Sequence, residues 1–438
     1  MDTNSCIIRG GTVVCADRVL PDCDVVVIDG RIAAIEPVGA SDFDAQPDAT
    51  MGVLPVVDAR GAYVVPGLID IHSDYVENVA SPRPSVVMDL STSLYKADRE
   101  LVSHGVTTIF HSLSVYGAHV FDHKPIRDFG NVSALIDRVA ALRAGEERDH
   151  LIRHRLHMRV ELDSVDLYDD IESFLRSGKV DLVSFMDHTP GQGQYRDLLV
   201  FGDTLKGYRD VSDEDVRDIV RQQQESQKLT YAQITALASV ARERGVSIAS
   251  HDDDSEDKLA FMDGLEATIS EFPISLDIAR AARARGMHTI AGNLSAREAV
   301  QAGAIDVLCS DYYPAALLDA VFTLRDQCGL DIAKAFALVT INPAKAAGIA
   351  DEVGSIAVGK RADVLLVREI SCGEGSGEHP VAGPDSRVAR TMPVVTRAFV
   401  GGRSVFRSHY PDQPRGYGRD TEQLVSLDQL SRPLAKAV

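Results

Sequence analysis

The chain has 438 residues, 45% of them hydrophobic and 25% charged, which is typical of a globular protein with one large domain and a smaller one. Its 45 basic and 65 acidic residues give a formal net charge of −20, which argues against non-specific binding to nucleic acid or to an anionic membrane. The six scattered cysteines disfavour a disulfide framework and a cysteine zinc site. Because no signal peptide and no membrane-spanning run is found either, we expect a cytoplasmic protein.

The two ends of the chain carry the same kind of pattern. Residues 6–36 contain β-branched runs that are broken by "GG" and "DG", which are turn signals. Residues 353–367 and 394–406 have the same character. Both ends are therefore predicted to form short strands, unlike the middle of the chain.

The middle of the chain alternates short apolar runs with longer helical patterns, such as residues 133–147 and 230–245. This alternation is typical of α/β proteins with a parallel sheet, and eight strand–helix units indicate a closed barrel. The polar connection 189–228 is long enough to be a candidate active-site lid. The eight predicted strands are 68–74, 106–112, 156–163, 182–188, 246–252, 266–273, 288–293 and 304–311.

Several of these runs end in a potential metal ligand. In "GLIDIHSDYVEN" (67–78), His72 and Asp74 are two residues apart, so in a strand they point to the same face. Alone, the pair fits a metal site and a polar pair at a strand end equally well. A histidine or a carboxylate recurs at the same end of five or six strands. This recurrence favours a metal site, since buried ionisable groups are costly without partners. The candidates are His72, Asp74, His111, Glu161, His188, His251 and Asp311.

Imidazole and carboxylate ligands suit zinc, with manganese and iron as alternatives. His111 is the weakest candidate, because no second ligand type stands beside it. The acidic run Asp252–Asp254 is expected to cap a helix or to support ligands, rather than to supply three ligands.

Together these residues resemble the amidohydrolase superfamily. The resemblance rests on "PGLIDIHSD" (66–74) after an N-terminal β segment, on Asp311 after the eighth strand, and on "TINPAKAAGIADEVGSIAVGKRADVLLV" (340–367). It implies a distorted (β/α)8 TIM barrel over residues 63–350. A small β-sandwich domain would be formed by both chain ends, residues 1–62 and 351–438.

A narrower resemblance, covering roughly residues 6–407, is to the superfamily's alkylphosphonate-utilisation enzymes. It rests on "SFMDHTPGQGQY" (184–195) and "SDYYPAALLDAVF" (310–322). These enzymes hydrolyse the triphosphate of α-D-ribose 1-methylphosphonate 5-triphosphate and release diphosphate in phosphonate catabolism. The same activity is therefore implied for this chain.

The resemblance also implies roles for the candidate ligands. His72, Asp74 and Asp311 would hold one divalent metal, Glu161 would bridge two metals, and His188 and His251 would complete the second site. Two zinc ions are expected. Asp311 would be the catalytic base that accepts a proton from the attacking water and passes it to the leaving group.

Two departures from this narrower pattern leave the substrate open. The segment 291–306 is shorter than expected, and Gly193 stands where a basic residue is expected. Arg83, Arg159, Arg196 and Lys206 remain as candidate phosphate ligands, each with a solvated surface charge as the alternative. Arg83 is favoured because Pro82 and Pro84 flank it and stiffen its backbone.

The sequence is compatible with three functions. The first is the metal-dependent diphosphatase, acting on a phosphorylated small molecule. The second is an amidohydrolase that cleaves a C–N bond in a cyclic amide, an amidine or an N-acyl compound. The third is an inactive barrel scaffold, which retention of every predicted ligand argues against. The sequence leaves open whether the chain forms a homo-oligomer.

Overall fold

The computed structural model describes residues 4–39, 53–83, 85–117, 124–145, 150–208, 210–292, 296–371, 391–410 and 424–426. The eight-stranded parallel sheet in the middle of the chain confirms the predicted α/β barrel, and each predicted strand is found. Its strands are β6 (Leu68–Ser73), β7 (Val106–Val115), β8 (Arg153–Glu161), β9 (Leu182–Met186), β10 (Ser247–His251), β11 (Ile269–Glu271), β12 (His288–Gly292) and β13 (Val307–Cys309).

The barrel closes between its first and last strands. Ser73 and Asp311 form a parallel bridge, and the N–H of Asp311 donates to the carbonyl of His72 at 3.1 Å. The N–H of Asp74 in turn donates to the carbonyl of Asp311 at 2.7 Å. The barrel is distorted, since β11 and β13 have only three residues each and the register of β6 against β7 shifts twice.

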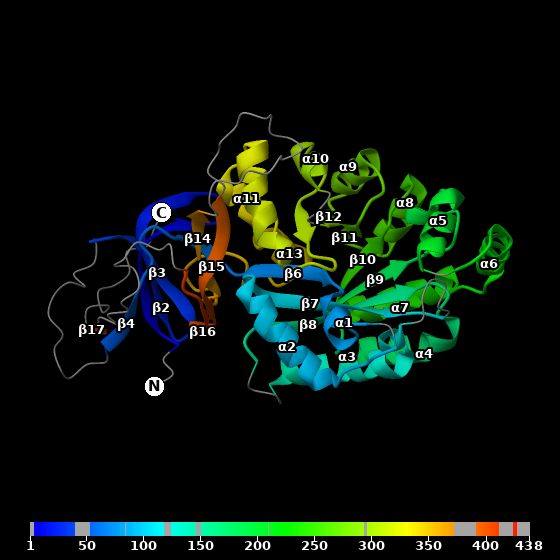
Figure 1. The fold of residues 1–438 in the computed structure, drawn as a ribbon, viewed down its shortest axis with the longest axis horizontal. Helices are drawn as coiled ribbons and strands as arrows, with labels where there is room; N and C mark the ends of the chain where they lie inside the picture. The colour runs from blue at the N-terminus through cyan, green and yellow to red at the C-terminus, as the bar shows by residue number, and fades with distance from the viewer. Residues whose placement is uncertain are drawn as a thin grey trace.

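Helices cover the outside of the barrel (Figure 1). The predicted helix 230–245 is α7, which begins after Thr230 with a capping box to Gln233 and ends before Gly245. The helices are α1 (Tyr75–Ala80), α2 (Leu90–Ser103), α3 (Phe129–Ala144), α4 (Tyr168–Arg176), α5 (Leu198–Tyr208), α6 (Asp213–Glu225), α7 (Tyr231–Glu243), α8 (Glu256–Gly264), α9 (Leu276–Ala284), α10 (Arg297–Gln301), α11 (Ala316–Cys328), α12 (Ile332–Ala337) and α13 (Ile341–Ala346). None of the helices in the described ranges combines the length and the apolar content needed to cross a bilayer.

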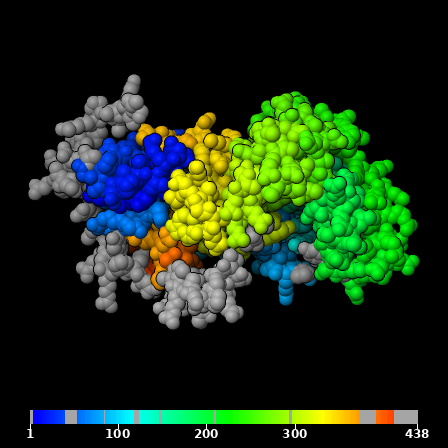
Figure 2. All heavy atoms as spheres, turned by 90° about the horizontal axis from the view of Figure 1, so that it is seen from above, coloured from blue at the N-terminus to red at the C-terminus, as the bar shows by residue number. Residues whose placement is uncertain are grey.

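Strands from both chain ends form a second, mixed sheet beside the barrel, and the N-terminal and C-terminal strands lie together in Figure 2. Its order is β16 (Arg403–Arg407), β15 (Thr391–Val400), β14 (Val364–Ser371), β5 (Tyr63–Pro66), β1 (Cys6–Val14), β2 (Val19–Ile28) and β3 (Arg31–Pro37). Off this path, β4 (Val53–Asp58) pairs with β1 and with β17 (Leu424–Ser426). Because β5 belongs to this sheet, the barrel itself begins at Leu68.

The two sheets share one hydrophobic layer. Leu68 of the barrel packs in the same buried cluster as Leu365 and Val395 of the second sheet. The buried Asp363 also accepts hydrogen bonds from the guanidinium of Arg153 at the start of β8. These contacts attach the second sheet at the amino-terminal ends of the strands, so the opposite edge of the barrel stays available for a site.

Candidate metal centre

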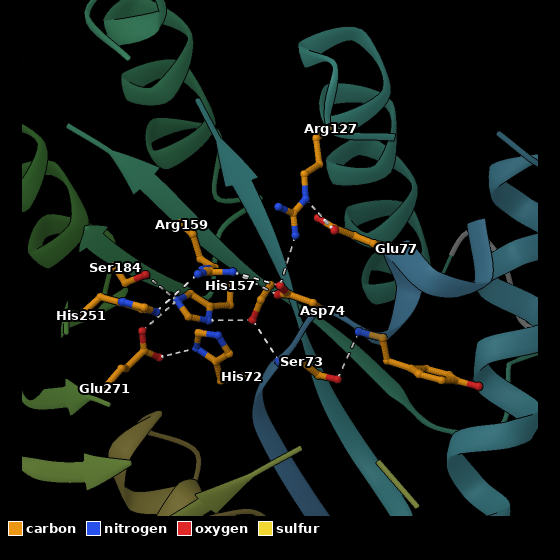
Figure 3. Close-up of polar contacts among 12 residues, drawn as sticks. His72, Ser73, Asp74, Glu77, Arg127, His157, Arg159, Ser184, His251 and Glu271 are labelled. Atoms are coloured by element: carbon orange, nitrogen blue, oxygen red, sulfur yellow. Dashed lines mark hydrogen bonds and ion pairs between the residues drawn. The ribbon is translucent and has the colours of Figure 1, made fainter. Parts of the chain in front are cut away.

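The carboxyl edge of the barrel carries the predicted ligands. Glu161 and His251 end β8 and β10, while His188 and Asp311 each lie two residues beyond β9 and β13. His72 and Asp74 come from the end of β6. Figure 3 shows His72, Asp74 and His251 directed toward one another above the strands. The barrel thus gathers side chains that are up to 239 residues apart in sequence, from His72 to Asp311.

His188 is surrounded by acceptors. Its Nδ1 lies 2.6 Å from Oε2 of Glu161, and its backbone N–H donates to Oε1 of the same carboxylate at 2.7 Å. Its Nε2 lies 3.5 Å from Oδ2 of Asp252. Burial alone would lower the pKa of His188, but the Glu161 and Asp252 carboxylates outweigh it and raise the pKa to about 10.

His72 sits in a second cluster. Its Nδ1 lies 3.0 Å from Oε1 of Glu271 at the end of β11, and its ring lies 5.6 Å from that of His251, centre to centre. Burial, together with the Arg159 cation, lowers the pKa of His72 to about 3. The neutral imidazole has a free lone pair, which is the form that binds a metal.

These clusters fit a divalent cation. Among the described residues, two groups place one ligand atom from each member within 4.8 Å of the others: His72, His251 and Glu271, and His188, His251 and Asp252. Three buried atoms in these groups make no hydrogen bond within the described residues, and their ion-pair contacts are long: Nδ1 of His251 at 3.3 Å, Oδ2 of Asp252 at 3.5 Å and Oε2 of Glu271 at 3.8 Å. Buried polar atoms without partners are rare, and a bound cation is one way to satisfy them.

The grouping differs from the expected pairing of ligands. Glu271 is not one of the ligands predicted from the sequence. It nevertheless stands near the end of the sixth predicted strand, the position at which the other ligands are predicted. Asp252 joins the His188 group, whereas the other two acids of the run have structural partners. Asp253 accepts from Ser250 and Ser270, and Asp254 accepts from the N–H of Gly193.

Two arginines hold Asp74. Nη1 of Arg159 donates to both of its carboxylate oxygens at 3.2 and 3.1 Å, and Nη2 of Arg127 lies 3.5 Å from Oδ2 (Figure 3). Arg127 also donates from Nε to Oε2 of Glu77 at 2.8 Å. Arg127 gave no sequence signal because it lies in the short 3-10 turn 125–127 before α3, away from any strand end.

Asp311 is half-buried beside the Asp74 carboxylate. Burial, followed by the neighbouring Asp74 carboxylate, raises the pKa of Asp311 to about 6. Its φ of 56° is left-handed, as are those of Asp252 (53°) and Phe272 (53°), which directly follow β10 and β11. Left-handed conformations of non-glycine residues store strain and gather at functional sites, so these three positions also mark this edge of the barrel.

His111 belongs to a different network. Strand β7 continues to Val115, so His111 lies within the strand, with Nε2 2.8 Å from Nδ1 of His154. Nε2 of His154 lies 3.1 Å from Oδ1 of Asp98 on α2. His111 is absent from both candidate metal groups.

The predicted phosphate ligands other than Arg159 lie on the surface. Arg83 and Arg196 are exposed, and Lys206 pairs with Asp213. Within the part of the chain that the structure describes, no hydrogen bond or ion pair joins these three to the metal-ligand cluster. Pro84 and residues 293–295 of the shortened segment lie outside the described residues. The long connection 189–228 contains α5 and α6, and its role as a lid stays a prediction.

Comparisons with known proteins agree with this architecture. The sequence pattern of the amidohydrolase family matches residues 207–405. The α-D-ribose 1-methylphosphonate 5-triphosphate diphosphatase of Escherichia coli (strain K12) is 32% identical over 332 residues, covering 71% of this chain and 84% of that enzyme. The adenine deaminase of Paracoccus denitrificans (strain Pd 1222) is 35% identical over 107 residues, covering 24% of this chain and 15% of that enzyme. The crystal structure of a Xaa-Pro dipeptidase superposes with a TM-score of 0.60 at 13% identity, covering 92% of this chain and 100% of that one.

Proposed function

This chain belongs to the amidohydrolase family, and from that premise we propose that it is a metal-dependent diphosphatase. The substrate would be α-D-ribose 1-methylphosphonate 5-triphosphate, cleaved at a phosphoanhydride bond with release of diphosphate. The observation that carries the proposal is the 32% identity to the Escherichia coli diphosphatase across 84% of that enzyme. The matched length distinguishes this relative from the adenine deaminase, of which only 15% is matched.

The residues of the carboxyl edge would divide the work. His72, His188, His251, Glu161, Glu271 and Asp252 would hold one or two divalent ions, with Asp74 and Asp311 beside them. Such ions polarise a phosphoryl oxygen and lower the pKa of a bound water. The carboxylate of Asp311 would take the proton of the attacking water and deliver it to the departing diphosphate. Arg159, buried beside Asp74, would offer a cation to the phosphate oxygens.

A second candidate is cleavage of a C–N bond in a cyclic amidine or amide. The local match to adenine deaminase supports it, as does the exposure of Arg83, Arg196 and Lys206, which removes three expected phosphate ligands from contact with the cluster. A hydrolase of neutral rings needs fewer cations near the metals than a triphosphate hydrolase does.

The identity of the released product distinguishes the two functions. Protein loaded with zinc or manganese is incubated with the ribose triphosphate, and phosphorus NMR distinguishes diphosphate from single phosphate. Parallel reactions with adenine and with dihydroorotate are assayed for ammonia and for ring opening. We expect diphosphate from the triphosphate only. Ammonia release or ring opening without diphosphate release would replace the proposed function with the second candidate.

A further inference from the structure

A cavity of about 260 Å³ opens beside the candidate metal centre, between the ends of β7 and β8 and the start of α3. Ser114, Tyr116, Arg127, Asp128, Phe129 and Asp166 are among its lining residues. Arg127 connects it to the centre, since the same guanidinium lies 3.5 Å from Asp74. A ligand in this cavity would therefore extend from the candidate metals along one side of the barrel mouth.

One buried group in this cavity lacks a partner. Ser114 is 1% exposed, and its hydroxyl oxygen makes no hydrogen bond within the described residues. Ser112, two positions earlier on β7, points to the barrel interior, where its hydroxyl contacts His157 and the N–H of Ser73. Residues two apart in a strand share a face, so Ser114 points to the same side, one layer nearer the mouth. Its oxygen is buried, so a ligand's hydroxyl could satisfy it only from the cavity that Ser114 lines.

The charges in the cavity disfavour an anion. Arg127 is engaged on three sides: Nε donates to Glu77, Nη1 donates to the hydroxyl of Tyr116 at 3.3 Å, and Nη2 faces Asp74. The half-buried Asp128 and the exposed Asp166 also line the cavity, and their negative charges would repel a phosphate. Asp166 makes no hydrogen bond or ion pair with another described residue. Carboxylates that face a cavity are strong acceptors for hydroxyl groups, as in the acidic residues that bind ribose in dinucleotide sites.

The size and the apolar wall suit a small ring. Liquid water occupies about 30 Å³ per molecule, so 260 Å³ is the volume of about nine water molecules, which is enough room for a pentose with its hydroxyl groups. Phe129 and the ring of Tyr116 give the cavity aromatic surface, against which the C–H face of a sugar can pack.

We propose that this cavity is a subsite for the vicinal hydroxyl groups of a pentose, with Asp166 accepting from the diol and Ser114 completing its hydrogen bonds. The choice of a pentose rests on the proposed function, whereas the preference for hydroxyl groups over anions rests on the cavity itself. The subsite would select the sugar, while the cluster of histidines and carboxylates acts on the substituent that the sugar carries.

The test compares two probes that differ by one hydroxyl group, ribose 5-phosphate and 2-deoxyribose 5-phosphate. Their affinities for the metal-loaded protein are measured by calorimetry. The wild type should bind ribose 5-phosphate more tightly, by roughly tenfold to a hundredfold, which is typical for a hydrogen bond to a charged group. Asp166→Asn and Ser114→Ala should lose most of this preference. Asp169→Asn, an exposed acid in the first turn of α4 that does not line the cavity, is the matched control and should keep it.

The outcomes separate this inference from the proposed function. Equal affinities of the wild type for the two probes, binding of neither, or a preference that survives both variants would overturn the pentose subsite. Diphosphate release from the triphosphate, combined with any of these results, would leave the proposed function standing. A preference for ribose that the two variants abolish, without any diphosphate release, would keep the subsite and reject the diphosphatase.

Discussion

Arg159 and Asp74 form a buried ion pair at the barrel mouth, with Nη1 of the arginine 3.2 and 3.1 Å from the two carboxylate oxygens. The second terminal nitrogen, Nη2, lies 3.3 Å from Nε2 of His251. One guanidinium therefore stands between two side chains that are predicted to hold different metal ions. Arginine supplies positive charge where a bound metal would also supply it. A bound metal should therefore restore part of the folding stability that is lost when Arg159 is removed.

This relationship predicts how Arg159→Gln responds to metal. In metal-free protein the variant should unfold at a temperature several degrees lower, because breaking a buried ion pair typically costs about 3–5 kcal/mol. Zinc should narrow the difference by neutralising Asp74 and by stabilising the folded state. Arg176→Gln is the control, since its pair with Glu172 on α4 is exposed and should contribute less than about 1 kcal/mol. The melting temperatures of both proteins are measured with and without zinc. If zinc leaves the difference between wild type and Arg159→Gln unchanged, the metal does not compensate for the lost arginine.

Metal binding itself is predicted to depend on His251, the member that both candidate groups share. Metal analysis of wild-type protein prepared without chelator should find about one ion or more per chain. His251→Ala should lower that content and weaken zinc binding by calorimetry. His409→Ala is the control, because His409 is exposed next to the second sheet. Absence of metal from the wild type, with no uptake on addition of zinc or manganese, would refute the metal site.

Asp311→Asn is predicted to stop turnover while much of the metal stays bound. The amide keeps the shape of the side chain but cannot accept a proton, and loss of a positioned general base typically reduces the rate by about a hundredfold to ten-thousandfold. Steady-state kinetics and metal analysis on the same preparation test both parts. A fully loaded variant with nearly normal turnover would mean that another group takes the proton.

Arg83→Ala tests the sequence-based expectation of a phosphate clamp on the first barrel loop. If Arg83 folds over the centre when substrate binds, kcat/KM should fall selectively for phosphorylated compounds, since a guanidinium pairs two phosphate oxygens at once. Arg99→Ala, an exposed arginine on α2, is the matched control. A kcat/KM for phosphorylated substrates equal to the wild-type value would mean that Arg83 stays on the solvated surface, where the structure places it.

Stability at low pH should depend on Asp306, which precedes β13. Burial alone would raise the pKa of Asp306, but hydrogen bonds from His288 and from the N–H of Thr289 outweigh it and lower the pKa. A carboxyl group with a lowered pKa stabilises the fold above its unfolded-state value and loses this contribution as the pH falls through its folded-state value. Asp306→Asn should therefore reduce the melting temperature at pH 7, and the gap to wild type should close below about pH 4. If the difference in melting temperature between wild type and Asp306→Asn does not change with pH, the loss of stability comes from packing and not from the charge of Asp306.

The strands and most of the proposed ligands were within reach of the sequence because their signals are local. A buried strand is an apolar run of limited length, and a ligand at its carboxyl end is simply the next polar residue. His72, His188 and His251 each follow such a run. His111 shows the limit of this signal, because β7 continues three residues beyond the predicted end and leaves that histidine inside the strand, against His154.

The sequence by itself determined the alternation of strands and helices, the strand character of both chain ends, and the edge at which polar residues gather, since each depends on periodicity within a short window. Only the tertiary structure decided which side chains meet. Glu271 faces His72 because closure of the barrel sets the distance between β6 and β11, and Arg127 reaches Asp74 from a turn that belongs to no strand. Such contacts depend on the register and tilt of strands far apart in the chain, and no local pattern of residues encodes them.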